Sequence, residues 1–285
     1  MLLLEANLSQ NTQMAYQRDL KLLANTLAAQ TPSIELAQAD SQAIQLALDT
    51  LADNHQASSM GRLRSATRRF YRWLVREQIR QTDPTTSLQT GKAVRKLPQD
   101  LSPQQVEALL SSPDTSTALG LRDRAMLEVL YATGLRVSEL VSLTPHQISL
   151  EQGLIRVTGK GDKTRLVPLG EIAQQWLISY YQTARAELLG QRSADAVFVT
   201  RRGDGLTRQA FWYRLKAHAR AAGLGTLPSP HTLRHAFATH LLNNGADLRA
   251  LQMLLGHQDL STTQIYTHIA TTRLEVLHQQ HHPRG

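Results

Sequence analysis

The sequence contains no cysteine. A disulfide framework and a cysteine-based zinc site are therefore excluded, and the absence fits a reducing compartment. The chain also lacks an apolar run of 18 residues, the length that predicts a membrane span. Its first residues, MLLLEANLSQNTQ, have a short apolar run but neither a cationic region nor a small-residue cleavage site, so we predict no signal peptide. These absences make the cytoplasm the expected location.

Internal repeats, heptad arrays and low-complexity segments are also missing. The chain has 285 residues, of which 41% are hydrophobic. This is enough for one large domain or two ordinary ones, each with a buried core. We therefore expect a globular protein.

Acidic residues are scarce in one part of the chain. The net charge is +8 and the pI about 10.0, which indicates a polyanionic partner, although an acidic protein or a lipid surface would also fit. Residues 1–60 are net acidic, whereas residues 61–100 hold ten basic residues against Glu77, Asp83 and Asp100. The positive charge is concentrated rather than spread.

Apolar spacing predicts amphipathic helices over residues 11–27, 40–54 and 58–78. In the third helix, apolar residues such as Leu63 and Phe70 follow one face and arginines fall largely elsewhere. A merely solvated face usually mixes charges of both signs, so a face of arginines favours contact with phosphate. The predicted DNA-binding residues of this helix are Arg62, Arg64, Arg68, Arg69, Arg72 and Arg76.

Proline, glycine, threonine and lysine without sustained periodicity follow the third helix and indicate a linker. We predict a helical DNA-binding domain over residues 1–88, a linker over 89–99 and a second domain over 100–285. The fold class is therefore mainly α with two domains. The first domain would be helical, and the second would be α+β with a small antiparallel sheet.

In the second domain, Ser102 and Pro103 begin a helix, and a buried helix ends at Gly134. The stretch LIRVTGKGDKTRLVPLG alternates around Ile155, Val157, Leu166 and Val167, which predicts a β-hairpin with GKGDK as its turn. Further helices are expected over residues 171–189, 207–222, 232–243, 247–254, 261–267 and 270–278.

The helix expected over residues 207–222 has an apolar face of Phe211, Leu215 and Ala219. Its basic residues predict a second DNA-facing helix, so that the two domains would clamp a duplex. The basic residues are Arg208, Arg214 and Lys216.

Three separated stretches carry residues that suit phosphoryl chemistry, although each is weak alone. ATGLRVSEL contains Arg136, which could simply pair with Glu139, and GKGDK contains Lys160, which could be solvated. His231 and His235 stand four residues apart and could share a zinc ion, but no HExxH glutamate lies between them and no cysteine is available.

Taken together, ATGLRVSEL, GKGDKTRLVPLG, HTLRH, LLGH and STTQIYTH, in this order, closely resemble the tyrosine recombinase (phage integrase) family. The match spans both domains and is closest to the Xer site-specific recombinases. The resemblance implies cutting and rejoining of double-stranded DNA without a cofactor or a bound metal. It places Tyr266 as the nucleophile and the remaining catalytic residues at Arg136, Lys160, His231, Arg234 and His257.

These residue types fit that reaction. The transition state of phosphoryl transfer spreads negative charge over the non-bridging oxygens, which arginine forks can bind. A tyrosine has a pKa of about 10 and needs a helper to become a nucleophile, for which His231 is suited. The expelled 5′ oxygen is strongly basic and needs a general acid, for which Lys160 is suited. His235, His240 and His268 are expected to be structural.

The resemblance further implies resolution of chromosome dimers by two such subunits with two of a XerC-type partner, under the control of an FtsK-type DNA translocase. Three alternatives stay open: a phage or mobile-element integrase, a topoisomerase-like enzyme that relaxes DNA, and a non-catalytic DNA-binding regulator. The tail, TTRLEVLHQQHHPRG, would dock into a neighbouring protomer, although docking onto its own domain stays open. Family members usually have most of a further helix before the segment matching LSQNTQMAY, where this sequence has MLLLEAN. Either the start of the sequence is misassigned or the DNA clamp lacks a piece, and the second alternative would affect DNA affinity and partner contact but not the catalytic positions.

Overall fold

The computed structural model describes residues 8, 10–88, 101–158, 164–255, 276 and 278–284. It divides into two compact units, residues 1–97 and 98–285, and each is described by itself. The predicted linker, the hairpin turn with Lys160, His257 and the predicted helix with Tyr266 lie outside the described residues.

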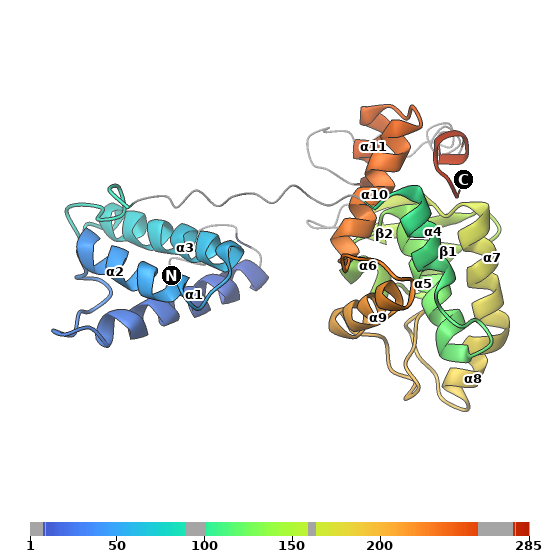
Figure 1. The fold of residues 1–285 in the computed structure, drawn as a ribbon, viewed down its shortest axis with the longest axis horizontal. Coiled ribbons are helices and arrows are strands. Elements are labelled where there is room, and N and C mark those ends of the chain that lie inside the picture. The colour runs from blue at the N-terminus through green and yellow to red at the C-terminus, as the bar shows by residue number, and fades with distance from the viewer. Residues whose placement is uncertain are drawn as a thin grey trace. The chain divides into compact units, whose positions relative to one another are not determined.

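The described part of the first unit contains three helices, α1 (Gln10–Ala28), α2 (Ser41–Ala52) and α3 (Ala57–Arg76) (Figure 1). All three predicted helices are confirmed. The carboxylate of Asp40 caps α2 by accepting a hydrogen bond from the Ala43 amide at 2.8 Å. The apolar stripes meet in one core, whose largest members include Leu23, Ile44, Leu63 and Tyr71.

The second unit is built around α5 (Ala118–Thr133), which is buried over most of its length. It packs against α4 (Pro103–Ser111), α7 (Glu171–Ser179) and α10 (Pro230–Asn243). Ser102 forms a capping box with Gln105 at the start of α4, and Gly134 ends α5 in a left-handed conformation, both as predicted.

A three-stranded antiparallel sheet in the order β1-β2-β3 lies in the same unit. Its strands are β1 (Ile148–Ser149), β2 (Leu154–Thr158) and β3 (Thr164–Pro168). The hairpin strands are confirmed, but Leu166, which the sequence analysis counted in the alternating apolar set, is not one of the inward residues of β3. Val157 pairs with Arg165 and Ile155 with Val167, so Arg165 is buried and Leu166 only half-buried.

The helices after the sheet also agree with the prediction in outline. Residues 171–189 form one helical stretch, made of α7, a π-helical segment (Tyr180–Ala184) and α8 (Arg185–Leu189). They are followed by α9 (Arg208–Ala221), α10 and α11 (Leu248–Leu255). α10 begins two residues earlier than predicted, because Ser229 caps it and Pro230 suits its first position. Two short elements were not predicted, α6 (Val137–Val141) and a 3₁₀ turn (Pro145–Gln147).

The described part of the C-terminal tail docks onto its own unit. His278 is 1% exposed and donates a hydrogen bond from Nε2 to the Ala132 carbonyl at 2.6 Å. The ring of His282 stacks on that of His278 with centroids 4.7 Å apart, and Arg284 pairs with Glu107. The described tail residues therefore pack on their own unit, which is the alternative to docking into a neighbouring protomer that the sequence analysis left open.

The predicted fold class, mainly α with a small antiparallel sheet in the second unit, is confirmed. Among the described helices, none is both long and apolar enough to cross a membrane.

Candidate active site

The end of α5 and the middle of α10 approach each other closely beside the candidate site. Gly134 has φ +58°, and a side chain there would collide with the ring of Phe237 on α10. Glycine therefore serves both the left-handed turn and the packing. The turn directs the chain into α6, with Arg136 as the residue that precedes the helix.

Arg234, on α10, connects two loops that are far apart in the sequence. One of its terminal nitrogens donates to the carbonyl of Gly134, and the other donates to the carbonyl of Leu255 at 2.7 Å. Gly134 stands two residues before Arg136, and Leu255 stands two residues before His257. One guanidinium thus holds together three of the stretches that the sequence singled out.

The carboxylate of Glu139 lies at the centre of a second set of contacts. Its Oε2 accepts a hydrogen bond from the Arg136 amide at 2.7 Å, and its Oε1 accepts one from the Arg136 side chain at 3.0 Å. Arg165 donates to both oxygens, at 3.0 and 2.9 Å, and its Nε donates to the Leu254 carbonyl at 3.1 Å. The ion pair of Arg136 with Glu139, considered from the sequence as an alternative role, is therefore present.

These charges affect one another. Burial, followed by the repulsion of Arg136, lowers the pKa of Arg234 to about 10, which still leaves it charged at neutral pH. Burial alone would raise the pKa of Glu139, but the hydrogen bonds from Arg165 and from the Arg136 amide outweigh it, so the pKa is lowered. The carboxylate therefore stays ionised and can orient the arginines.

Of the six predicted catalytic residues, Arg136, His231 and Arg234 are described. His231 is exposed in the first turn of α10, three residues before Arg234, so both belong to one side of the helix. Lys160, His257 and Tyr266 lie outside the described residues. Within the described ranges, no group of three or more histidine, aspartate or glutamate side chains is placed to hold a metal ion.

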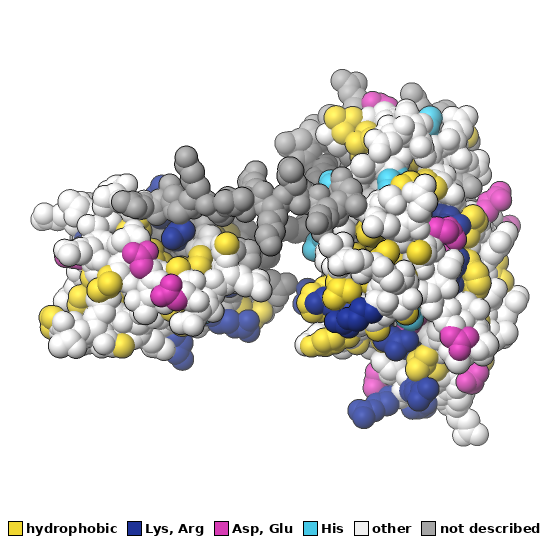
Figure 2. Space-filling model, viewed as in Figure 1, with side chains coloured by type: hydrophobic (Ala, Val, Ile, Leu, Met, Phe, Trp, Pro, Cys, Tyr) yellow, Lys and Arg dark blue, Asp and Glu magenta, His cyan; other side chains and the backbone are white. Residues whose placement is uncertain are grey.

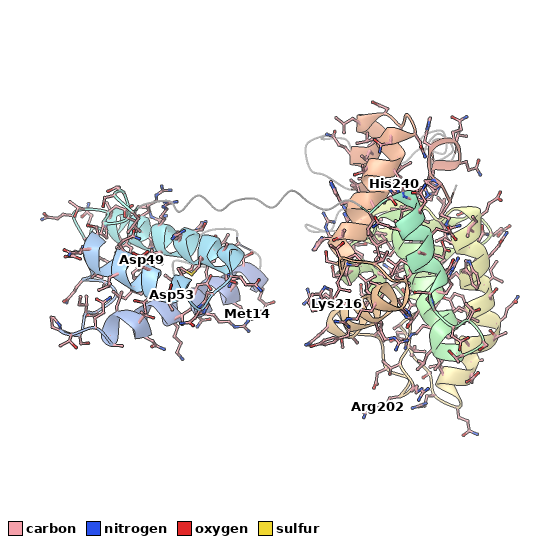
Figure 3. The ribbon with its side chains drawn as sticks, in the orientation of Figure 1. Met14, Asp49, Asp53, Arg202, Lys216 and His240 are labelled. Atoms are coloured by element: carbon pink, nitrogen blue, oxygen red, sulfur yellow. The ribbon has the colours of Figure 1, made fainter. Side chains whose placement is uncertain are left out.

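The other histidines differ in their surroundings. His240 is buried, its Nε2 donates to the Leu101 carbonyl at 2.9 Å, and its Nδ1 lies 2.8 Å from the Tyr131 hydroxyl. The structural role predicted for His240 agrees with this position on α10 (Figure 3). His235 is exposed, and His268 lies outside the described residues.

Arg165 was not identified from the sequence as a residue of the site, and Glu139 was considered only as an ion-pair partner of Arg136. A signal for Arg165 was present, because strict alternation from Val167 places residue 165 on the inward side of β3. A charged residue at an inward position requires a partner. Glu139, 26 residues earlier, could not be assigned to it from spacing alone.

The predicted DNA-binding arginines of α3 fall into two groups. Arg62 forks onto the carboxylate of Asp19, with contacts at 2.7 and 3.0 Å that join α3 to α1, and Arg76 pairs with Glu77 at 2.9 Å. The others make no hydrogen bond or ion pair with another residue in the described part of the chain. They are Arg64, Arg68, Arg69 and Arg72.

Basic and hydrophobic side chains lie together on the surface over α9 (Figure 2), and the sequence of this helix includes aromatic residues. The ammonium of Lys216 lies 3.5 Å from the centre of the Trp212 ring, and Tyr213 beside it is 60% exposed. Arg208, at the start of the helix, is exposed. Arg214 differs, because its guanidinium contacts the buried Asp123 at 2.5 Å. The predicted apolar face of α9 is buried.

Comparisons with known proteins identify relatives of this chain. A sequence model of the phage integrase family matches residues 99–273, and one of the phage integrase N-terminal SAM-like domain matches residues 1–78. Tyrosine recombinase XerD of Ralstonia nicotianae is 52% identical over 99% of this chain and 91% of its own length. Tyrosine recombinase XerD of Pseudomonas putida is 54% identical over 99% of this chain and 94% of its own length.

Solved structures show the same fold. The XerH site-specific recombinase bound to a palindromic difH substrate, a post-cleavage complex, has a TM-score of 0.72 and 25% identity over 93% of this chain and 78% of that one. A λ integrase dimer bound to a COC′ core site has a TM-score of 0.72 and 21% identity, over 90% of this chain and 91% of that one, which supports the fold alone.

The chain therefore belongs to the phage integrase family, the tyrosine recombinases. Its function is that of a XerD-type tyrosine recombinase, a site-specific recombinase that acts on DNA. The resemblance to the Xer recombinases is thus confirmed, and the curated relatives are of the XerD type within them.

Proposed function

We propose that Arg136, Lys160, His231, Arg234 and His257 act on one scissile phosphodiester while the hydroxyl of Tyr266 attacks its phosphorus. One observation carries this proposal. Arg234 bonds to the carbonyls two residues before Arg136 and two residues before His257, which draws the separated motifs towards one place. A site that handles a single phosphate needs this convergence.

The chemistry of each side chain suits one role in this reaction. Arg136 and Arg234 neutralise the charge that develops on the non-bridging oxygens, and His257 donates a further hydrogen bond to one of them. His231 accepts the proton of the Tyr266 hydroxyl as it attacks. Lys160 protonates the departing 5′ oxygen, because an alkoxide is too basic to leave unaided.

The bond exchange is balanced. The Tyr266 oxygen forms a bond to phosphorus as the bond from phosphorus to the 5′ oxygen breaks, which gives a 3′-phosphotyrosyl link and a free 5′-hydroxyl. One phosphoester replaces another, so the energy of the bond is retained and the step as written uses neither ATP nor a metal ion. The 5′-hydroxyl of a second strand can reverse the attack, so cutting and joining are one reversible reaction.

DNA is held by cationic surfaces on both units. On α3 the arginines without an internal ion pair, Arg68, Arg69 and Arg72 among them, contact phosphates. On α9 the basic residues Arg208 and Lys216 serve the same purpose. Arg62, Arg64, Arg76 and Arg214 were also predicted to bind DNA, and the ion pairs of Arg62, Arg76 and Arg214 make them weaker candidates.

We further propose that the enzyme resolves chromosome dimers in chromosome partition and cell division. Two subunits would act with two of a XerC-type recombinase on paired DNA sites, under the control of an FtsK-type DNA translocase, in the cytoplasm where the chromosome lies. The names of the curated relatives and their identity to this chain support this role. In such a tetramer the tail would leave its own unit and dock onto a neighbour.

A test begins with the DNA. Fragments of the chromosome that stay attached to the protein after denaturation identify its site by sequencing. A plasmid with two copies of that site is then incubated with the protein and the XerC-type recombinase of the same organism. Recombination into two circles is the expected result, and it should require both proteins. Relaxation of supercoils without exchange would indicate a topoisomerase, and binding without any covalent attachment would indicate a regulator; either outcome contradicts the proposal.

A further inference from the structure

Arg165 is an interior arginine whose contacts all lead to the candidate active site. It pairs across the hairpin with Val157, and its side chain is 7% exposed. Its hydrogen bonds reach Glu139 on α6 and the carbonyl of Leu254 at the end of α11. β3 begins at Thr164, directly after the stretch that contains Lys160. One side chain therefore links three of the segments that carry catalytic residues.

The contacts of Arg165 use the full shape of a guanidinium. The two terminal nitrogens meet the two oxygens of Glu139 in parallel, at 3.0 and 2.9 Å, while Nε points to a different group at 3.1 Å. A lysine has a single nitrogen and cannot make this fork and the third bond together. The site is thus specific for arginine and not merely for positive charge.

Glu139 is held by two arginines. Arg136 approaches from one side, with its amide on Oε2 and its side chain on Oε1. Its side chain is 41% exposed, so packing alone does not fix its direction. Without Arg165 the carboxylate could rotate, and the bond that directs the Arg136 guanidinium would be lost.

We propose that Arg165 is a positioning residue for DNA cleavage. It orients Arg136 through Glu139 and fixes the end of α11, from which the chain continues to His257 two residues after Leu255. It does not touch DNA, because it is buried. The inference rests on the proposed function, since it assigns Arg165 to the same site.

The test separates the chemical step from DNA binding. The probe is a nicked duplex carrying the site to which the wild-type protein becomes attached, and the measurement is the single-turnover rate of covalent adduct formation at saturating DNA. Arg165→Gln should reduce this rate about 100-fold, the order expected when a catalytic group is misplaced. Its dissociation constant for DNA should stay within about twofold of wild type, since no phosphate contact is removed.

Two matched variants control for charge and for stability. Arg156 lies on β2 of the same hairpin and is exposed, so Arg156→Gln removes the same charge without the buried contacts. Arg185 uses its guanidinium to bind the carbonyls of Val197, Ala194 and Ala196 away from the site, so Arg185→Gln removes a structural clamp. Below their unfolding temperatures, both should cleave within about twofold of wild type.

Two results would overturn the positioning role of Arg165. A loss in Arg165→Gln no larger than that in Arg185→Gln, or a loss of rate matched by an equal loss of affinity, overturns the proposal. If Arg165→Gln does not fold, Arg165→Lys is judged by the same measurements, and it should fold and cleave at an intermediate rate. If the wild-type protein forms no adduct, the proposed function itself fails, which is distinct from a failure of Arg165 alone.

Discussion

Arg214 donates from its Nε to Asp123 at 2.5 Å, and Asp123 is 1% exposed. The same carboxylate also contacts Arg122 at 2.7 Å and His218 at 2.8 Å. Because Asp123 is on α5 and both Arg214 and His218 are on α9, these contacts join the two helices. Because the Arg214 guanidinium is bound to this buried carboxylate, it is not available to bind a DNA phosphate. This relationship changes the expectation for a residue that the sequence alone had assigned to DNA.

Arg214→Ala should therefore affect stability more than DNA binding. We expect a loss of about 1 kcal/mol, because Asp123 keeps two partners and the half-exposed Arg214 is screened by solvent. The slope of log binding constant against log salt concentration should stay unchanged, whereas Lys216→Ala should make it shallower by about 1. Thermal unfolding and salt titrations of DNA binding measure both. A shallower slope in Arg214→Ala would show that Arg214 contacts phosphate.

Asp123 should also make stability depend on pH in the acid range. Burial would raise its pKa, but hydrogen bonds from His218 and Arg122 outweigh this and lower it. A lowered folded-state pKa means that Asp123 stabilises the protein above the unfolded-state pKa of about 4, and that this contribution is lost as pH falls through the folded-state value.

The variant Asp123→Asn tests this directly. It should be less stable than wild type at pH 7, and the difference should shrink as pH falls below about 4. Denaturant unfolding measured at a series of pH values gives the result. A constant difference across that range would show that the ionisation of Asp123 is not coupled to folding.

The arginines of α3 can be compared in the same experiment. Arg72 is exposed and has no ion pair within the described part of the chain, while Arg62 is held by Asp19. Arg72→Ala should weaken DNA binding and reduce the salt slope by about 1. Arg62→Ala should change the slope less and the stability more, because Asp19 is buried and loses its partner. An equal salt dependence of DNA binding in wild type and Arg72→Ala would show that this face of α3 does not contact DNA phosphates.

The role of Lys160 can be tested by changing the leaving group. Removal of a general acid should slow cleavage by about 10² to 10⁴-fold, so Lys160→Ala should be slow on ordinary DNA. A 5′-bridging phosphorothiolate expels a much less basic sulfur and should restore the rate. Single-turnover cleavage of both substrates by both proteins gives the comparison. A defect of equal size on the two substrates would exclude Lys160 as the acid.

Much of the fold could be predicted from the sequence because its signals are local. Helix caps such as Ser102, the end of α5 at Gly134 and the apolar stripes depend on neighbours a few residues apart. The contacts of Arg165 with Glu139 and of Arg214 with Asp123 could not be predicted, since they join residues 26 and 91 positions apart. Local patterns show that a charge is buried, but not which residue balances it.

The candidate site was found by resemblance of its motifs rather than by periodicity. The structure adds how two of its arginines are held, through Gly134, Leu255 and Glu139. It also separates the residues predicted to bind DNA into those with and without internal ion pairs. Neither distinction follows from the order of residue types along the chain.

In the proposed reaction, Tyr266 attacks the phosphodiester. The measurement that tests it most directly is digestion of the covalent protein–DNA adduct followed by mass spectrometry of the peptide that carries the nucleotide. We expect a 3′-phosphate linked to Tyr266 and no adduct from Tyr266→Phe, which should still bind the same DNA. A nucleotide on another residue, or an adduct that persists in Tyr266→Phe, would contradict it.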